Sequence, residues 1–157
     1  MNALIILFSY HHKNTEKIAQ VIAKTLGAEI KNPSEVDPNS LASYDLVGFG
    51  SGVYFGKHHK VLLNFTDKIP QETNKKAFIF STSGQTGNMA KFHKQLKEKL
   101  QSKGFDIVSE FNSAGLDTFG LLKIGGGIQK GRPNEDDLKE AEEFALSLKK
   151  NIPEATK

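Results

Sequence analysis

The chain contains no cysteine among its 157 residues. Disulfide bonds, thiol catalysis and thiolate metal ligands are therefore excluded, and any redox chemistry must come from a bound cofactor. No apolar run approaches the length of a membrane-spanning helix, and polar residues interrupt the first apolar run too early for a signal peptide. These absences predict a soluble, cytoplasmic protein with no membrane span.

A concentrated block of positive charge is also missing, although the formal net charge is +3 and the sequence pI is about 9.0. Lysines are spread among acidic residues on apparent helix faces, which is typical of solvated surface. Only Lys57–Lys60 and Lys94–Lys99 come close to the basic stripe that nucleic-acid binding needs. The sequence therefore argues against a nucleic-acid partner.

Strand and helix patterns alternate along the chain, which predicts βαβ units around a mainly parallel sheet. Strand-like segments, most of them continuous apolar runs, lie at 3–8, 28–31, 45–50, 77–81 and 105–111. Residues at helical spacing lie near 15–26, 61–69, 89–100 and 135–148. The expected organisation is one domain of residues 1–150 with five strands, followed by a C-terminal tail at 151–157. Asn134 is the predicted cap of the last helix.

Polar and glycine residues follow three of the predicted strands, at Ser9–Thr15, Gly50–Gly56 and Ser81–Gly87. Parallel sheets bind ligands at the carboxyl ends of their strands, so these three segments are expected to converge on one crevice. Small and hydroxyl-bearing residues let the backbone approach a planar ligand, and Tyr54 and Phe55 can stack on a ring. Taken singly, each segment also fits an ordinary turn.

The first of these segments joins a strand to a helix. Hydroxyls at Ser9 and Thr15, the Asn14 amide and the N–H groups of the helix N-terminus can all donate to one anion. The helix dipole favours negative charge at the same place. A phosphate site and a simple helix cap by Asn14 or Thr15 both fit this pattern.

Over nearly its whole length the chain resembles the flavodoxin family. The Ser9–Thr15 turn is similar to the loop that holds the phosphate of flavin mononucleotide (FMN) in that family, with Ser9, Asn14 and Thr15 at matching ends. The segment Val53–His58 is similar to the ring-contacting loop of one branch, the menaquinone-dependent protoporphyrinogen oxidases. The resemblance implies a flavodoxin-like three-layer αβα sandwich with a five-stranded parallel sheet.

The chain departs from the usual flavodoxin pattern in two places. The phosphate turn is one residue longer and carries His11, His12 and Lys13, and this longer spacing is again similar to the protoporphyrinogen oxidase branch. The segment Gln85–Asn88 lacks the second aromatic residue that is common after strand four. The outer face of the flavin ring is therefore left without an assigned contact.

The resemblance implies noncovalent FMN binding by residues at the strand ends, with no catalytic residue and no metal ligand assigned. The implied FMN contacts are Ser9, His11, His12, Lys13, Asn14 and Thr15 at the phosphate, Ser51, Gly52, Val53, Tyr54, Phe55 and Gly56 at one side of the ring, and Thr82, Ser83 and Gly84 at its other side. The implied function is electron transfer between redox partner proteins or to a small-molecule acceptor. Two alternatives stay open, namely an FMN-dependent oxidoreductase acting on a quinone or tetrapyrrole, and a non-catalytic module that binds another phosphorylated ligand or none.

The histidines allow several interpretations. His11 and His12 fit either a phosphate contact or an exposed turn. His58 and His59 flank the predicted flavin segment, where a proton-donor or substrate role is conceivable. Adjacent histidines seldom converge on one metal ion, and no carboxylate is spaced to join them. His93 is expected to be a partly exposed helix residue.

The segment 115–134 is long for a connection without clear structure. It fits a packed Ω-type loop. It also fits a lid or docking surface on which Lys130 and Arg132 meet an acidic partner or a substrate carboxylate.

Overall fold

The computed structural model describes residues 1–9, 14–84, 86–115 and 131–152. In this part of the chain five parallel strands form a sheet in the order β2, β1, β3, β5, β6, and a short strand β4 pairs antiparallel with β3. The strands are β1 (Ala3–Phe8), β2 (Glu29–Lys31), β3 (Leu46–Tyr54), β4 (Lys57–His58), β5 (Lys75–Ser83) and β6 (Phe105–Ala114). The helices are α1 (Asn14–Leu26), α2 (Lys60–Asp67), α3 (Met89–Ser102) and α4 (Glu135–Asn151), with short 3-10 helices η1 (Pro33–Glu35) and η2 (Pro38–Ser43) between β2 and β3.

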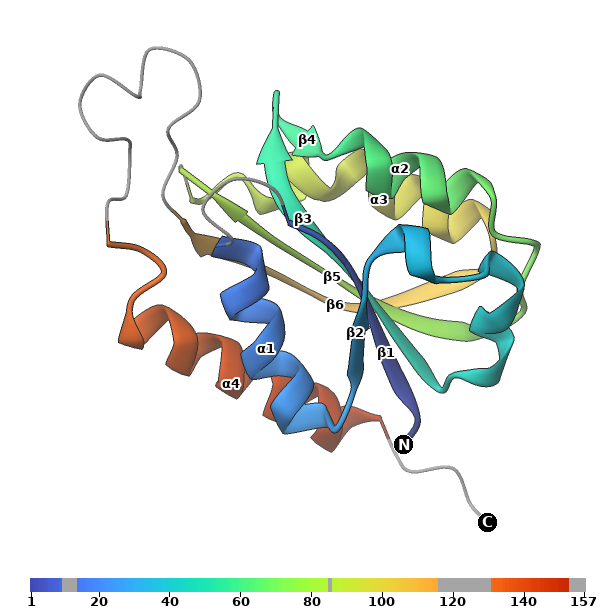
Figure 1. The fold of residues 1–157 in the computed structure, drawn as a ribbon, viewed down its shortest axis with the longest axis horizontal. Helices are drawn as coiled ribbons and strands as arrows, with labels where there is room; N and C mark the ends of the chain where they lie inside the picture. The colour runs from blue at the N-terminus through green and yellow to red at the C-terminus, as the bar shows by residue number, and fades with distance from the viewer. Residues whose placement is uncertain (10–13, 85, 116–130, 153–157) are drawn as a thin grey trace.

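Helices cover both faces of the sheet (Figure 1). On the face that carries α1 and α4, Ile5 packs in one buried cluster with Ile18 and Ala145. On the face that carries α2 and α3, Ile6 packs in a second cluster with Leu96. Neighbouring strand residues serve different clusters because successive side chains point to opposite faces. The expected three-layer αβα sandwich with a five-stranded parallel sheet is confirmed.

Two glycines in the central strand β3 make room for aromatic rings of β5. A Cβ atom on Gly48 would lie 2.2 Å from Cζ of Phe78, and one on Gly50 would lie 2.2 Å from Cζ of Phe80. Gly48 pairs with Phe78 and Gly50 with Phe80 in the sheet register, and both rings are fully buried. The glycines therefore set how closely the two strands and their side chains pack.

The end of β3 differs from the expected loop. The strand continues past Gly50 to Tyr54, and a tight turn then leads into β4. Phe55 and Gly56 are the two central residues of this turn, with φ values of +53° and +78°. Positive φ at both positions is typical of a type I′ hairpin turn, which suits the twist of the flanking strands. The expected ring-contacting segment is thus mostly part of a β-hairpin.

The start of α4 matches its sequence signal. The Asn134 side chain accepts a hydrogen bond from the Asp137 N–H at 3.0 Å, and the Asp137 carboxylate accepts one from the Asn134 N–H at 2.8 Å. This is a capping box, and Arg132 also pairs with Asp137. Most of the expected 115–134 connection lies outside the described residues. No helix in the described ranges is long and apolar enough to cross a membrane.

Candidate functional site

The carboxyl ends of four strands meet at one edge of the sheet. Phe8 in β1 pairs with Ser51 in β3, and Ser51 pairs with Ser81 in β5. Ser83 at the end of β5 pairs with Ala114 at the end of β6. The structure therefore brings together the carboxyl ends of β1, β3 and β5.

The first turn of α1 is held against this edge. Asn14 and Thr15 are buried, and Thr15 Oγ1 lies 2.7 Å from Thr82 Oγ1 in β5. A Cβ atom on Gly115, directly after β6, would lie 3.0 Å from Cβ of Asn14. Contacts to two strand ends thus fix the position of the helix N-terminus, where the dipole is positive and N–H groups lack intrahelical acceptors.

Ser9 connects β1 to this region and has an unusual hydroxyl group. Its Oγ atom is buried and has no hydrogen-bond partner among the described residues. A buried polar group without a partner costs about 1–3 kcal/mol, so an oxygen of a bound anion would relieve that cost. His11, His12 and Lys13 lie outside the described residues.

The β3–β4 hairpin carries a group of aromatic rings. His59 stacks on Phe8 with ring centroids 4.2 Å apart, and Tyr54 meets His59 edge-on at 4.8 Å. His59 Nδ1 also accepts a hydrogen bond from the Val61 N–H at 3.1 Å and so caps α2. Phe55 at the hairpin tip is 85% exposed. The hairpin therefore has a packed aromatic base and an apolar tip.

A contact between Ser51 in β3 and His58 in β4 holds the two strands of the hairpin together. His58 is 1% exposed, and its Nδ1 lies 2.9 Å from Ser51 Oγ. The His59 N–H donates to the same oxygen at 3.1 Å. The Nε2 atom of His58 is buried without a hydrogen-bond partner in the part of the chain that the structure describes. Burial, together with the nearby imidazole of His93, holds the pKa of His58 well below its usual range.

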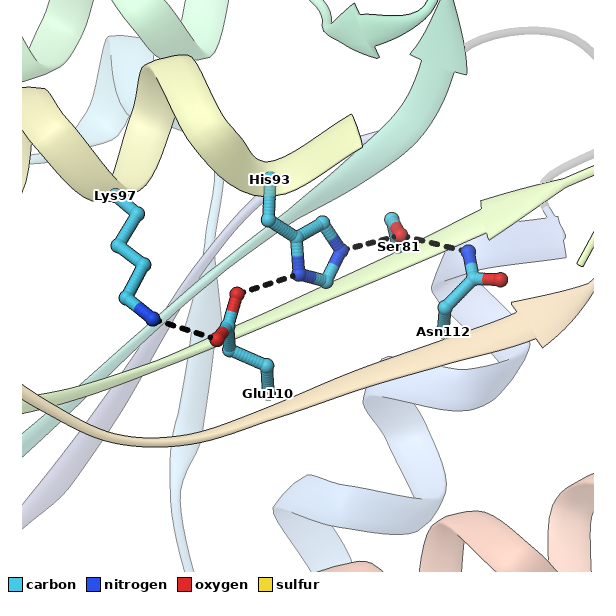
Figure 2. A network of polar contacts seen from close by, with 5 residues as sticks. All are labelled: Ser81, His93, Lys97, Glu110 and Asn112. Carbon is cyan, nitrogen blue, oxygen red and sulfur yellow. Dashed lines mark hydrogen bonds and ion pairs between the residues drawn. The ribbon is translucent and has the colours of Figure 1, made fainter. Parts of the chain in front are cut away.

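His93 is not the partly exposed residue that the sequence predicts, because its side chain is fully buried. Its Nε2 lies 2.6 Å from Ser81 Oγ and its Nδ1 lies 3.1 Å from a carboxylate oxygen of Glu110 (Figure 2). Lys97 donates to the other oxygen of Glu110 at 3.0 Å. Burial lowers the pKa of His93, and the adjacent carboxylate of Glu110 opposes that effect.

Asn112 extends this network along the sheet edge. Its side-chain amide donates to Ser81 Oγ at 2.9 Å and to Ser83 Oγ at 3.2 Å. In Figure 2 the side chains of Ser81 and Asn112 lie on neighbouring strands and point toward one another. A continuous chain of polar contacts thus runs from Lys97 to Ser83.

The remaining predicted site residues lie on the same edge. Gly52 pairs with Thr82 in the sheet, and Val53 pairs with His58 across the hairpin. Gly84 directly follows β5 and is buried. Across the described ranges, no group of three or more histidine, aspartate and glutamate side chains could hold a metal ion.

Sequence reasoning missed the network residues His93, Glu110 and Asn112. One signal was available for His93, since Met89, His93, Leu96 and Leu100 share a helical face. A polar residue inside such a stripe calls for a buried partner. Glu110 and Asn112 lie in β6, most of whose residues are only partly buried. A polar residue in such a strand does not stand out in the sequence as one that needs a buried partner.

The fold is that of a doubly wound α/β protein. If only the five parallel strands are numbered, their order in the sheet is 2-1-3-4-5. The turn from β1 to α1 lies at the carboxyl ends of the strands and suits an anion. The family model described as the flavodoxin domain matches residues 5–118. The chain belongs to this family, which confirms the resemblance seen in the sequence. It is also 56% identical over 151 residues to an uncharacterized protein of Methanocaldococcus jannaschii. The matched region covers 96% of this chain and 100% of that protein.

Solved flavodoxin structures share the fold. Flavodoxin 1 from Bacillus cereus superposes with a TM-score of 0.69 at 22% identity, covering 97% of this chain and 100% of that one. A Fusobacterium nucleatum flavodoxin bound to flavin mononucleotide gives a TM-score of 0.69 at 15% identity, covering 98% and 100%. At these identities the similarity concerns the fold.

Proposed function

We propose that this protein binds FMN noncovalently at the carboxyl edge of its sheet and passes electrons between redox partners or to a small acceptor in the cytoplasm. One observation carries the proposal: the buried Ser9 hydroxyl has no partner among the described residues and precedes the N-terminus of α1 in a flavodoxin-domain protein. A phosphate group fits such a position because it offers several acceptor oxygens and negative charge. Flavodoxin structures of the same fold, one of them bound to FMN, support the choice of ligand.

The proposed phosphate contacts come from the first turn. Ser9, Asn14 and Thr15 hold the phosphate together with backbone N–H groups of α1. His11, His12 and Lys13 are assigned to the same group, although they lie outside the described residues. Positive charge or N–H donors at these three positions would strengthen binding of a dianion.

The proposed ring contacts come from the hairpin and from the end of β5. Residues 51–56 border one side of the flavin, and residues 82–84 border its other side. The flavin supplies the electron-accepting chemistry when it is bound, and the protein sets its exposure and electrostatic surroundings. The packed rings of Tyr54, His59 and Phe8 hold the hairpin against the end of β1. Residues 1–150 form the proposed FMN-binding domain.

A second candidate function is an FMN-dependent oxidoreductase that acts on a quinone or tetrapyrrole. The exposure of Phe55, at 85%, favours it because an apolar hairpin tip offers a surface to a flat, apolar substrate. Electron transfer remains the first proposal, since the flavodoxin-domain match and the flavodoxin structures of the same fold support it.

Binding of FMN and of riboflavin to the flavin-free protein tests this proposal. The two ligands share the isoalloxazine ring but only FMN carries a phosphate. We expect flavin fluorescence to be quenched by binding, with FMN bound at least about tenfold more tightly, which corresponds to about 1.4 kcal/mol. Equal affinity for both ligands would contradict the phosphate site. Absence of binding by either would contradict the flavin assignment and favour a module for another phosphorylated ligand.

A further inference from the structure

A polar network crosses the interior between α3 and the sheet, directly behind the proposed flavin site. At its centre the buried imidazole of His93 contacts Ser81 through Nε2 and Glu110 through Nδ1 (Figure 2). Burying an ionisable ring is costly unless its partners are in place, and both ring nitrogens of His93 have one.

The network has one end near solvent and one end at the site. The side chains of Glu110 and Lys97 are 18% and 39% exposed, so protons from water can reach the carboxylate. On the other side, Ser81 receives a hydrogen bond from Asn112, which also donates to Ser83. Ser83 is one of the proposed flavin contacts. A continuous set of hydrogen bonds therefore joins the protein surface to Ser83 at the carboxyl end of β5.

A second branch reaches the opposite side of the same site. The ring of His58 lies with its centroid 5.0 Å from that of His93, and its Nδ1 bonds to Ser51. Ser51 and Ser81 are paired in the sheet, so the two serine–histidine pairs lie side by side on β3 and β5. The imidazoles thus lie behind both proposed flavin borders.

The charges around His93 come from each element packed against it. Glu110 faces it from β6, His58 from β4 and Lys97 from the next turn of α3, whereas β5 contributes the neutral hydroxyl of Ser81. The carboxylate and the ammonium group cancel, so the cluster is neutral while both imidazoles are neutral. Of the two imidazoles, His93 is the one that the Glu110 carboxylate helps to hold a proton, because Glu110 raises the pKa of His93 against the effect of burial.

We propose that His93 is a redox-linked proton site that gains one proton when the bound flavin is reduced and loses it when the flavin is reoxidised. The inference rests on the proposed function. For each full reduction, a one-electron donor such as a reduced viologen supplies two electrons in turn. FMN, when bound, would supply the electron-accepting chemistry, and uptake of two electrons with one proton would add one negative charge to the site. A second proton passes from water by way of Glu110 to the imidazole, which then carries N–H groups at both nitrogens.

The bonding of His93 suits both states. In the neutral ring one nitrogen is an N–H donor and the other an acceptor, which matches a carboxylate at Nδ1 and a hydroxyl at Nε2. In the protonated ring both nitrogens donate, to Glu110 and to Ser81, because a hydroxyl oxygen can also accept. A negative charge on the flavin favours the protonated ring. Before reduction, burial lowers the pKa of His93 and so favours the neutral ring, which can accept a proton.

The pH dependence of the flavin midpoint potential tests the proposal. The FMN-loaded full chain is titrated spectroelectrochemically with viologen mediators between pH 6 and pH 8, as wild type, H93Q and K99M. Glutamine can keep the bond to Ser81 but cannot take a proton. Lys99→Met is the matched control, because Lys99 lies on the same helix but pairs with Asp67. We expect the two one-electron steps together to take up two protons in wild type and K99M and one in H93Q, which is a twofold fall in the slope of their mean potential against pH.

The protonation state of His93 can also be measured directly in the wild-type protein. The ¹⁵N imidazole signals of the wild-type protein at pH 7 should change from a neutral to a doubly protonated pattern on reduction, and E110Q should reduce that change. Equal slopes for wild type and H93Q, or a neutral His93 in the reduced protein, would overturn this inference while leaving FMN binding intact. A chain that retains no FMN fails already at loading, and that result overturns the proposed function and this inference together.

Discussion

Thr15 Oγ1 lies 2.7 Å from Thr82 Oγ1, so a buried hydroxyl pair joins the first turn of α1 to the end of β5. The two residues are far apart in the chain and come from two of the three segments that the sequence places at the ligand edge. This contact holds the first turn of α1, which carries proposed phosphate contacts, against the end of β5, which carries proposed ring contacts.

Replacing Thr15 by valine should destabilise the protein by about 1–3 kcal/mol, because the Thr82 hydroxyl stays buried without its partner. The double variant T15V/T82V should cost less than the sum of the two single variants, since it leaves no unpaired hydroxyl. Urea denaturation of the four proteins measures this coupling. Strictly additive effects would show that the pair contributes nothing beyond packing.

Replacing Ser9 by alanine should weaken FMN binding about 10- to 100-fold, because a hydrogen bond to a charged group contributes about 1.5–3 kcal/mol. Riboflavin binding should be unchanged, since riboflavin has no phosphate. Ser43→Ala is the control, because the exposed Ser43 hydroxyl donates to the Ser40 backbone carbonyl within η2. Fluorescence titrations of both ligands decide the matter, and unaltered FMN affinity in S9A would remove Ser9 from the phosphate site.

The predictability of this fold differs from one element to another. The apolar runs of β1 and β5 and the capped start of α4 are local features, so their patterns predict them well. The hairpin after β3 was missed because a phenylalanine at positive φ carries no turn signal of its own. Its conformation depends on the pairing of β4 with β3, which is a tertiary interaction.

The candidate site was predictable only in part, for a similar reason. Residues at strand ends can be assigned to one edge of a parallel sheet from their order alone, as for Ser51 and Thr82. The burial of His93 depends on Glu110, a residue in another element. Single-sequence patterns do not show which polar residues will meet across a helix and a sheet.

Replacing Gly48 by alanine should destabilise the fold by about 3 kcal/mol, since the new methyl group would overlap the buried ring of Phe78. Removing the ring in the double variant G48A/F78L should recover part of that loss. Thermal or urea unfolding of the two single variants and the double variant measures the recovery. If F78L gives no relief in the G48A background, the steric explanation is wrong.

Stability should fall as the pH decreases below about 6.5, because His58 is neutral and buried in the folded state. The pKa of His58 is lowered by folding, so the unfolded chain binds more protons at pH values between its folded and unfolded pKa. Stability is therefore lost as the pH falls through that window, by up to about 1.4 kcal/mol per pH unit for one group.

Asparagine at position 58 can keep a bond to Ser51 but does not titrate. The difference in unfolding free energy between pH 7.5 and pH 5.5 should therefore be smaller for H58N than for wild type. Urea denaturation at the two pH values gives both differences. A parallel decline in the two proteins would assign the acid sensitivity to other groups.

The most direct test of the whole account is anaerobic photoreduction of the protein after it has been loaded with FMN and freed of unbound ligand. We expect FMN to be retained and to pass through a stable blue one-electron-reduced form, which would favour an electron carrier. Retained FMN that is reduced directly by two electrons would contradict the carrier function and favour the oxidoreductase. A protein that retains no FMN would contradict FMN binding and, with it, both flavin-dependent functions.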